Sequence, residues 1–402
     1  MNAQVVGNVV ERPTSVAEAS QLLRDTDGTV LFRGAGTALG WGGHVAPTDL
    51  TVDTRRLTGV VSHTAGDMTA SVRAGTPLAE VQATVGEHGQ WLALDPPTEA
   101  AGATLGGLLA AGDSGPARLR YGNLRDLVIG VTLVLPDGTV ARSGGNVIKN
   151  VAGYDLAKLV HGSMGSLALV AEVVVRLHPR PVGSATTVGT ADATQAADAA
   201  TRLSASTLEP TAVEWFTTAD GGTGRLLVRS DGSPASVSAA TAGVEAVFAE
   251  VGVGAFSCPP ADVPGLWAEL ARAVVGEQDD TVVRVTTLPS DLADVAVHAQ
   301  RSAERAGVRL GLVSSAALGL HTLRLADGSP QAIATVVDEV RGHALGRGGS
   351  VLVRHRPADA VVDPLGPPPS SVALLQRVTE QFDPTGRCAP GRFEPWYRRR
   401  PA

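Results

Sequence analysis

Cysteine is nearly absent from this chain of 402 residues, which contains only Cys258 and Cys388. Two thiols cannot build the disulfide framework of a small secreted protein, and an iron–sulfur cluster usually needs four cysteine ligands. The scarcity of cysteine therefore favours a reducing, cytoplasmic setting and argues against an iron–sulfur centre held by this chain alone.

Long apolar runs and excess positive charge are also missing. The longest apolar stretch, from Leu167 to Leu177, is interrupted by Glu172 and Arg176, and it is too short for a bilayer span, which takes about 20 apolar residues. The N-terminal stretch MNAQVVGNVVERP has neither a basic leader nor an apolar segment, so we expect no signal peptide. A formal net charge of -7 argues against non-specific nucleic-acid binding, which needs a basic face. Any membrane contact is expected to go through a partner.

Hydrophobic residues are plentiful, at 44% of the chain, so a sizeable core can form in two or three domains. Up to residue 181 the patterns predict short strands, among them Thr29–Arg33, Leu50–Asp53 and a buried strand at Leu167–Leu177. From about residue 184, strands alternate with Ala-rich helices, which is typical of an α+β domain. The expected strands are Val213–Phe216, Arg225–Arg229, Val282–Thr286 and Val351–Arg354, and the expected helices are Gln195–Leu203, Ser236–Glu250, Leu288–Ala306 and Gln331–Leu345.

The strongest local motif is the loop Arg33-Gly34-Ala35-Gly36-Thr37, which directly follows a predicted strand. Glycine permits a positive φ, so successive N–H groups can turn toward one anion, and such a nest suits a pyrophosphate. A Rossmann fingerprint is the main alternative, since Asp53 lies near the position of its ribose-binding acid. However, the third glycine of the fingerprint G-x-G-x-x-G is displaced by one residue, to Gly40. The link to Leu50 also contains too many Gly and Pro residues for a crossover helix. A tight surface turn without a ligand stays open as well.

Residues 96–126 form a second unusual segment, PPTEAAGATLGGLLAAGDSGPARLRYGNLRD. It is rich in Gly and Ala and poor in bulky side chains, so we expect a long loop whose backbone approaches a flat or phosphorylated group. A loosely packed Ala/Gly helix is the alternative.

These motifs occur in a specific order. The strings RGAGT, ATLGG, RYGNLRD and KNVAGYDLAKLVHGSMGS, within residues 10 to 181, resemble the FAD-binding (PCMH-type) domain of the vanillyl-alcohol oxidase superfamily. The resemblance implies an α+β fold with a two-subdomain FAD-binding domain (1–181), an α+β cap or substrate domain (182–365), and a C-terminal segment (366–402) packing back on the FAD domain. It also implies one FAD, whose pyrophosphate lies on the first loop and the ATLGG segment.

The resemblance carries over to individual positions. The residues that it places along FAD are Arg33, Gly34, Ala35, Gly36, Thr37, Ala38, Gly40, Trp41, Pro97, Ala103, Thr104, Gly107, Ser114, Tyr121, Gly122, Gly165, Glu172 and Val173. Many relatives attach flavin through a histidine at the position of Thr37, so we expect non-covalent FAD here; His44 lies seven residues further along the loop.

The C-terminal string VDPLGPPPSSVALLQRVTEQFDPTGRCAPGRF resembles one branch of the superfamily, the FAD-binding subunits of bacterial glycolate oxidases. Ala389 stands where members often carry asparagine. The resemblance implies a part in oxidising a small 2-hydroxy acid, glycolate to glyoxylate, and in electron transfer, together with a catalytic flavin subunit and an iron–sulfur subunit.

Catalytic residues are harder to assign, since such chemistry needs a cation for the carboxylate and a base for the hydroxyl. The metal-binding segment His-x-Gly-Asp-Gly-Asn-x-His of related catalytic subunits is absent, and the isolated His321 and His355 are typical of structural histidines, so we expect no metal. The catalytic candidates are the densest group of polar residues outside the Gly-rich loops: Lys149, Asn150, Tyr154 and Asp155. The alternative interpretation of this group is the capped start of a helix.

Three interpretations of the whole chain stay open. It is an accessory FAD subunit of a glycolate oxidase complex, a self-sufficient FAD-dependent oxidase or dehydrogenase of another alcohol or hydroxy acid, or a non-catalytic assembly subunit that kept the fold. The complete flavin motifs without a recognisable catalytic set favour the first.

Overall fold

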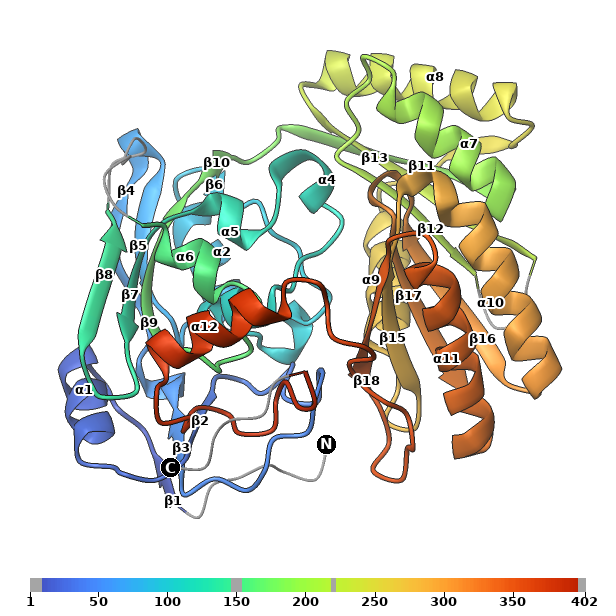
Figure 1. The fold of residues 1–402 in the computed structure, drawn as a ribbon. Coiled ribbons are helices and arrows are strands. Elements are labelled where there is room, and N and C mark those ends of the chain that lie inside the picture. The colour runs from blue at the N-terminus through green and yellow to red at the C-terminus, as the bar shows by residue number, and fades with distance from the viewer. Residues whose placement is uncertain (1–8, 146–153, 218–221, 397–402) are drawn as a thin grey trace. The chain divides into compact units, whose positions relative to one another are not determined.

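The computed structural model describes residues 9–145, 154–217 and 222–396, and the chain divides into two compact units (Figure 1). Unit A comprises the described parts of 9–115, 121–180 and 367–396, and unit B comprises those of 116–120 and 181–366. The chain therefore leaves unit A at Pro181 and belongs to it again from Pro367. The short stretch 116–120 joins unit B, where Arg120 forms an ion pair with Glu209 at 2.9 Å.

Unit A contains three sheets. A parallel sheet has the order β1-β3-β2, an antiparallel sheet has the order β4-β5-β9-β7-β8, and β10 pairs with β6. The strands are β1 (Val9–Glu11), β2 (Val30–Arg33), β3 (Leu50–Asp53), β4 (Val60–Thr64), β5 (Thr69–Arg73), β6 (Gln90–Trp91), β7 (Val128–Val134), β8 (Val140–Gly144), β9 (Leu169–Arg176) and β10 (His178–Pro179).

Short helices connect these strands, and several begin at a residue whose side chain caps the first turn. Ser15 caps α1, Thr104 caps α3, and Asp155 caps α6. The helices of unit A are α1 (Val16–Arg24), α2 (Leu78–Gly86), α3 (Leu105–Ala111), α4 (Arg118–Tyr121, which crosses the unit boundary), α5 (Leu124–Leu127), α6 (Leu156–Val160) and α12 (Val372–Phe382).

Strand β9 links the two hydrophobic cores of unit A. Its first part packs with α1 and the parallel sheet through Leu169 and Ala171, which are at most 2% exposed. Its second part packs with α2 and α3 through Val173 and Val175, which are fully buried. The start of β9 is therefore fixed at the junction of the two cores, where the candidate site lies.

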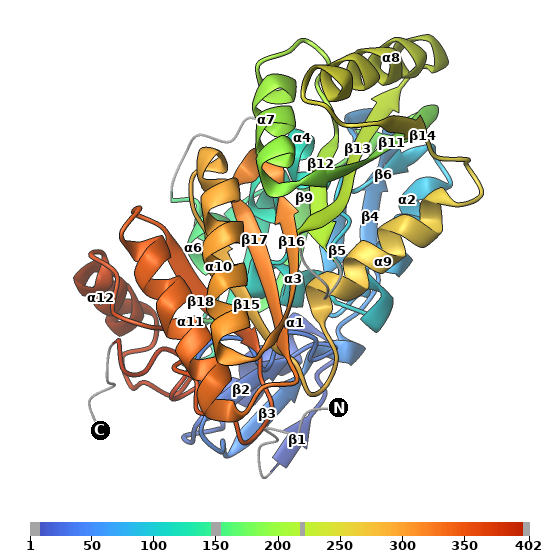
Figure 2. The same cartoon turned by 90° about the vertical axis from the view of Figure 1, so that its right-hand side faces the viewer.

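Unit B is one antiparallel sheet with the strand order β14-β11-β13-β12-β16-β17-β15-β18. Figure 2 shows helices α7, α10 and α11 lying over one face of this sheet, where a large apolar core also includes residues of α8. Residues of α9 pack in a smaller core with the opposite face. The elements are β11 (Gly183–Asp192), α7 (Ala193–Ser204), β12 (Ala212–Thr217), β13 (Thr223–Gly232), α8 (Pro234–Glu250), β14 (Ala255–Ser257), α9 (Val263–Val275), β15 (Thr281–Thr286), α10 (Leu292–Ala306), β16 (Arg309–Ser315), β17 (Leu320–Ala326), α11 (Pro330–Leu345) and β18 (Ser350–His355).

The predicted α+β class is confirmed, and the strands and helices expected in unit B lie within observed elements, except that the helix expected at Leu288–Ala306 begins only at Leu292, after a 3-10 turn at Pro289–Asp291. The expectation of one long loop at residues 96–126 is wrong, because this segment contains α3, α4 and α5. Thr104 and Asn123 cap two of these helices, and Gly112 ends α3 in the left-handed region at φ +66°. No helix among the described residues is long and apolar enough to cross a membrane.

Candidate functional site

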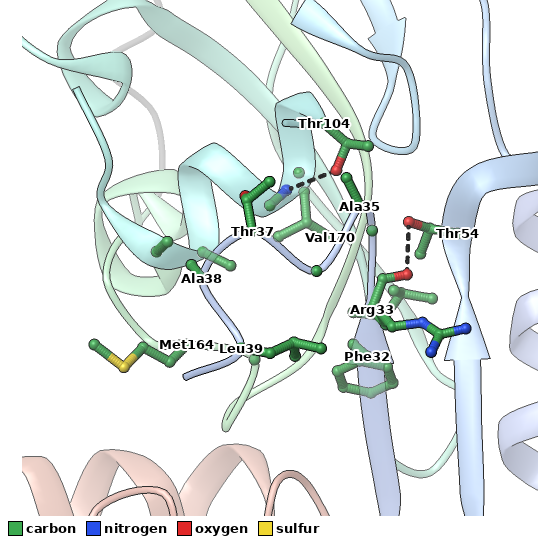
Figure 3. Close-up of a pocket in the computed structure, with 18 of the residues that line it drawn as sticks. Phe32, Arg33, Ala35, Thr37, Ala38, Leu39, Thr54, Thr104, Met164 and Val170 are labelled. Atoms are coloured by element: carbon green, nitrogen blue, oxygen red, sulfur yellow. Dashed lines mark hydrogen bonds between the residues drawn. The ribbon is translucent and has the colours of Figure 1, made fainter. Parts of the chain in front are cut away.

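A pocket in unit A lies where three backbone segments meet (Figure 3). The segment 32–39 follows β2, the segment 104–111 forms α3, and the segment 164–170 leads into β9. Thr54 and Arg392 complete the lining. Most of this lining is backbone or small side chains, which lets a ligand approach the main chain closely.

The loop after β2 supplies hydrogen-bond donors to this pocket. Gly36 has a φ of +83°, and the loop closes through a hydrogen bond from Leu39 N–H to the Gly36 carbonyl at 3.3 Å. Within the described residues, the four amides of residues 35–38 donate to no protein acceptor. Successive unpaired amides around a left-handed residue form a nest for an anion.

Close packing fixes the position of this loop against α3. A Cβ atom at Gly34 would lie 2.2 Å from Thr104 Oγ1, so only glycine fits there. Thr104 Oγ1 in turn accepts a hydrogen bond from Gly107 N–H at 3.3 Å and caps the helix. Two other amides of the first turn of α3 also have protein acceptors: Leu105 N–H donates to the Thr76 carbonyl, and Gly106 N–H donates to the Ala74 carbonyl. Helix α3 thus forms a wall of the pocket, and the amide donors come chiefly from the loop.

Positive charge accumulates on one side of the pocket. The Asp53 carboxylate, whose side chain is fully buried, pairs with Arg33 at 3.0 Å, Arg55 at 2.6 Å and Arg12 at 3.3 Å. Burial by itself would raise the pKa of Asp53, but hydrogen bonds from Arg55 and Arg33 outweigh it and hold this pKa well below its usual range. Three guanidinium groups around one carboxylate leave an excess of two positive charges, and Arg33 lines the pocket.

The same cluster settles the Rossmann alternative. Asp53 is engaged by arginines rather than facing a ribose. Every residue between β2 and β3 is described, and this link contains no helix. The argument from its many Gly and Pro residues is therefore confirmed.

The C-terminal segment of unit A reaches the same loop. Cys388 lies beside Val30 in a parallel bridge, which extends the edge of β2. The Arg392 side chain, 3% exposed, donates from Nη1 to the carbonyls of Leu39, Trp41 and Gly43 at 3.0, 2.5 and 3.1 Å.

The structure brings half of the predicted FAD residues into the pocket. Those lining it are Arg33, Gly34, Ala35, Gly36, Thr37, Ala38, Thr104, Gly107 and Gly165. Those outside its lining are Gly40, Trp41, Pro97, Ala103, Ser114, Tyr121, Gly122, Glu172 and Val173.

Several of the outer residues have other contacts. Tyr121 packs edge-on against Trp91 and His178, with ring centroids 5.4 and 4.9 Å apart. Glu172 accepts a hydrogen bond from Ser71 Oγ at 2.7 Å, and Val173 is fully buried in the core. Their roles toward FAD stay predictions.

Sequence reasoning did not single out the apolar and C-terminal part of the lining. The missed residues are Phe32, Leu39, Thr54, Gly106, Ala110, Ala111, Met164, Ala168, Leu169, Val170 and Arg392. Gly106 and Met164 lie inside motifs that were recognised. Arg392 likewise lies inside a recognised motif, since it follows Pro390-Gly391 in the C-terminal string.

The polar group near residue 150 is only partly described. Lys149 and Asn150 lie outside the described residues. Asp155 caps α6 by accepting from Lys158 N–H, and its carboxylate pairs with the Lys158 amine at 3.0 Å. The side chain of Tyr154 is exposed, and its carbonyl accepts from Ser143 Oγ. For Asp155 these contacts match the alternative of a capped helix start.

The two isolated histidines of unit B have structural partners. His321 is fully buried between Thr287 Oγ1 at 3.0 Å and Ser314 Oγ at 2.9 Å. Burial, followed by the positive charge of Arg284, lowers the pKa of His321 to about 4. His355 Nε2 lies 2.9 Å from the Gln278 carbonyl. Among the described residues no three His, Cys, Asp or Glu side chains gather as metal ligands.

The pocket and the fold together define an FAD-binding protein. Residues 8–144 match the family described as FAD binding domain. The fold is that of p-cresol methylhydroxylase, whose substrate-bound structure aligns with a TM-score of 0.73 over 95% of this chain and 88% of that one, at 15% identity. Alkyldihydroxyacetonephosphate synthase aligns with a TM-score of 0.72 over 96% of this chain and 76% of that one, at 16% identity.

Sequence comparison finds curated relatives among enzymes of hydroxy-acid oxidation. The chain is 39% identical over 137 residues to glycolate oxidase subunit GlcE of Escherichia coli, which is 34% of this chain and 39% of the relative. It is 33% identical over 175 residues to D-lactate dehydrogenase of Archaeoglobus fulgidus, which is 43% of this chain and 39% of the relative. The chain thus spans about two fifths of the length of these relatives.

The residues present fit the cofactor. A diphosphate needs several N–H donors at close range and positive charge nearby. The free loop amides of residues 35–38, the glycine at position 34 that lets the loop pack on Thr104, and the charge around Arg33 provide both.

Proposed function

We propose that this chain is the FAD-binding subunit of a glycolate oxidase or dehydrogenase complex and takes part in oxidising a small 2-hydroxy acid. The observation that carries the proposal is the nest of free amides at residues 35–38, inside a domain that matches the FAD-binding family. The similarity to glycolate oxidase subunit GlcE supports the placement in such a complex.

Within this proposal, the chain's own residues bind and orient the cofactor. The amides of residues 35–38 would donate to the pyrophosphate, and the charge excess around Asp53 would attract it. Bound FAD would supply hydride or single-electron transfer. The catalytic flavin subunit and the iron–sulfur subunit are the proposed partners, through which electrons enter and leave.

The accessory role is favoured by what the candidate catalytic residues do. Asp155 acts as a helix cap, and its carboxylate is paired with Lys158. His321 is enclosed by two hydroxyl groups in the core of unit B. These contacts give both groups structural roles, and we propose that the base for the substrate hydroxyl comes from the catalytic subunit.

A self-sufficient dehydrogenase is the second candidate, and the similarity to D-lactate dehydrogenases favours it. In that case the isolated chain oxidises its own hydroxy acid. A non-catalytic assembly subunit is the third, and it predicts a protein that purifies without flavin.

Stopped-flow absorbance separates these candidates. The purified FAD-loaded chain is mixed with glycolate or D-lactate, alone and after addition of the two partner subunits. We expect negligible flavin reduction in the isolated chain and rapid turnover in the complex. Rapid reduction in the isolated chain would contradict the accessory role and favour the dehydrogenase, whereas a colourless protein that cannot be loaded with FAD would favour the assembly subunit.

A further inference from the structure

The C-terminal segment contacts the phosphate loop through one buried cation. Arg392 Nη1 lies within 3.1 Å of three alternate carbonyls, those of Leu39, Trp41 and Gly43. One nitrogen carries only two hydrogens, so these carbonyls share its donors. Hydrogen bonds from a charged donor are stronger than neutral ones, and burial strengthens them further.

Backbone packing around Arg392 is equally close. Gly43 N–H donates to the Arg392 carbonyl at 3.1 Å, and Ala46 N–H donates to the Pro390 carbonyl at 2.9 Å. A Cβ atom at Gly43 would lie 2.3 Å from the Arg392 carbonyl oxygen, so this contact admits only glycine. The loop and the C-terminal segment therefore fit together without spare volume.

The loop has no regular secondary structure to fix its shape. No residue between Gly34 and Asp49 belongs to a helix or strand, and glycine occupies positions 34, 36, 40, 42 and 43. Such a chain loses much conformational entropy on ordering, so its geometry depends on contacts from elsewhere. The amides of residues 35–38 directly precede the carbonyls that Arg392 holds.

We propose that Arg392 is a positioning residue for the dinucleotide: it couples the C-terminal segment to the phosphate loop and so sets the affinity for FAD. Arg392 lines the same pocket as the loop residues 35–38, so its buried positive charge would also lie near a bound anion. The inference rests on the proposed FAD site. It assigns to the C-terminal segment a role in cofactor retention.

Arg387 provides a matched control on the same segment. It also donates to three backbone carbonyls, those of Gly28, Leu23 and Pro136, at 2.9, 3.3 and 3.1 Å. None of these three carbonyls belongs to the pocket lining. Loss of Arg387 therefore weakens the docking of the segment without touching the phosphate loop.

The test compares Arg392→Met and Arg387→Met in the full-length protein. FAD affinity is measured by titration of the apoprotein, and stability is measured by thermal unfolding without FAD. We expect Arg392→Met to weaken FAD binding by about tenfold or more, and Arg387→Met to lower the unfolding temperature with FAD affinity within about threefold of wild type. Equal effects of the two variants on FAD affinity, or none from Arg392→Met, would overturn the proposal.

Arg392→Lys separates the effect of positioning the loop from the effect of the positive charge. It also replaces Arg392→Met in the comparison with Arg387→Met if Arg392→Met does not fold. Lysine keeps the charge but lacks the planar fork that reaches several carbonyls. We expect it to recover FAD affinity only in part, and full recovery would assign the effect to charge alone and overturn positioning. Gly36→Val distinguishes the two levels of inference: if it binds FAD like wild type, the site itself is wrong, whereas loss there with an unaffected Arg392→Met removes only the role of Arg392.

Discussion

Gly36 is the residue whose backbone conformation shapes the donor nest. Its φ of +83° is rarely adopted by a residue with a Cβ atom, and a β-branched side chain resists it further. The nearest atom to a Cβ at this position would be Leu39 Cδ1 at 3.3 Å, so the side chain of Leu39 has to move or the loop must change shape. Gly36 is thus more sensitive to substitution than its partly exposed position suggests.

We expect Gly36→Val to weaken FAD binding by about tenfold or more, because a strain of about 1–2 kcal/mol shifts the loop away from the conformation that presents its amides. Circular dichroism should show an unchanged fold, since Gly36 itself is not part of a core cluster. Gly89→Val is the control: Gly89 also has a positive φ, of +67°, but nothing lies within 4 Å of it and it is outside the pocket lining. Wild-type affinity in Gly36→Val would contradict the phosphate-loop assignment.

Asp53 is the second residue with a measurable role. We expect Asp53→Asn to lower the free energy of unfolding at pH 7 by about 3 kcal/mol, because a buried carboxylate that neutralises Arg33 and Arg55 is lost. Since the folded-state pKa is depressed, this stabilisation is present above the pKa of the unfolded chain and is lost as pH falls toward the folded value. Urea unfolding at pH 7 and at about pH 2, well below the pKa of an unfolded aspartate, measures it.

The exposed Asp49 supplies the matched control for that experiment. It accepts hydrogen bonds from Thr29 N–H and Oγ1, both at 2.8 Å, directly before the start of β3. We expect Asp49→Asn to lower the free energy of unfolding far less than Asp53→Asn does, because exposed interactions of this kind contribute little to stability. Equal costs for the two variants would contradict the account of the buried arginine cluster.

At the scale of elements, the ends of α3 are determined by local residues and its position by distant ones. Its ends are encoded locally, by the Thr104 cap and by Gly112 in the left-handed region. Its position is set by contacts with residues distant in sequence, since a Cβ at Gly106 would lie 2.7 Å from the Cβ of Ala74, which directly follows β5. Composition alone indicated a loop because seven residues rich in Gly and Ala give a weak helical pattern.

Strand β17 carries a pH dependence for unit B. His321 is buried in the neutral form, and its pKa is lowered from 6.5 to about 4, so the unfolded chain takes up a proton more readily than the folded one. Stability is therefore unaffected well above pH 6.5 and declines as the pH falls toward 4, by up to about 3 kcal/mol. We expect His321→Gln to flatten this slope in denaturant unfolding between pH 7 and pH 4.

The surface residue His88 gives the comparison for β17. His88→Gln is the control for replacing a histidine at an exposed position. If His321→Gln keeps the wild-type slope, burial of this imidazole does not control the acid sensitivity of unit B.

At the scale of the whole molecule, the mode of FAD attachment follows from which residues reach the pocket. Thr37 lines it and cannot form the bond that a histidine makes to flavin, while His44 is exposed and outside the lining. We expect acid precipitation to release all flavin into the supernatant, in the wild type and in His44→Ala alike. Flavin that stays with the protein pellet would contradict non-covalent binding, and its loss in His44→Ala would identify the attachment residue.

The sequence by itself determined the features that depend on local backbone chemistry. The glycines of the RGAGT loop follow a strand that ends at Arg33, and the Gly- and Pro-rich link to Leu50 excluded a crossover helix. The alternation of strands and helices after residue 184 likewise predicted unit B, because side-chain periodicity is a property of consecutive residues.

Only the tertiary structure decided which distant segments meet. Sequence order offered Asp53 as a ribose acceptor, whereas packing buries it among three arginines. Val173 is fully buried in the core, and Leu169 and Val170 at the start of β9 line the pocket. Arg392 reaches Leu39 across 353 positions of sequence. Such contacts depend on close packing in three dimensions, which no local pattern encodes.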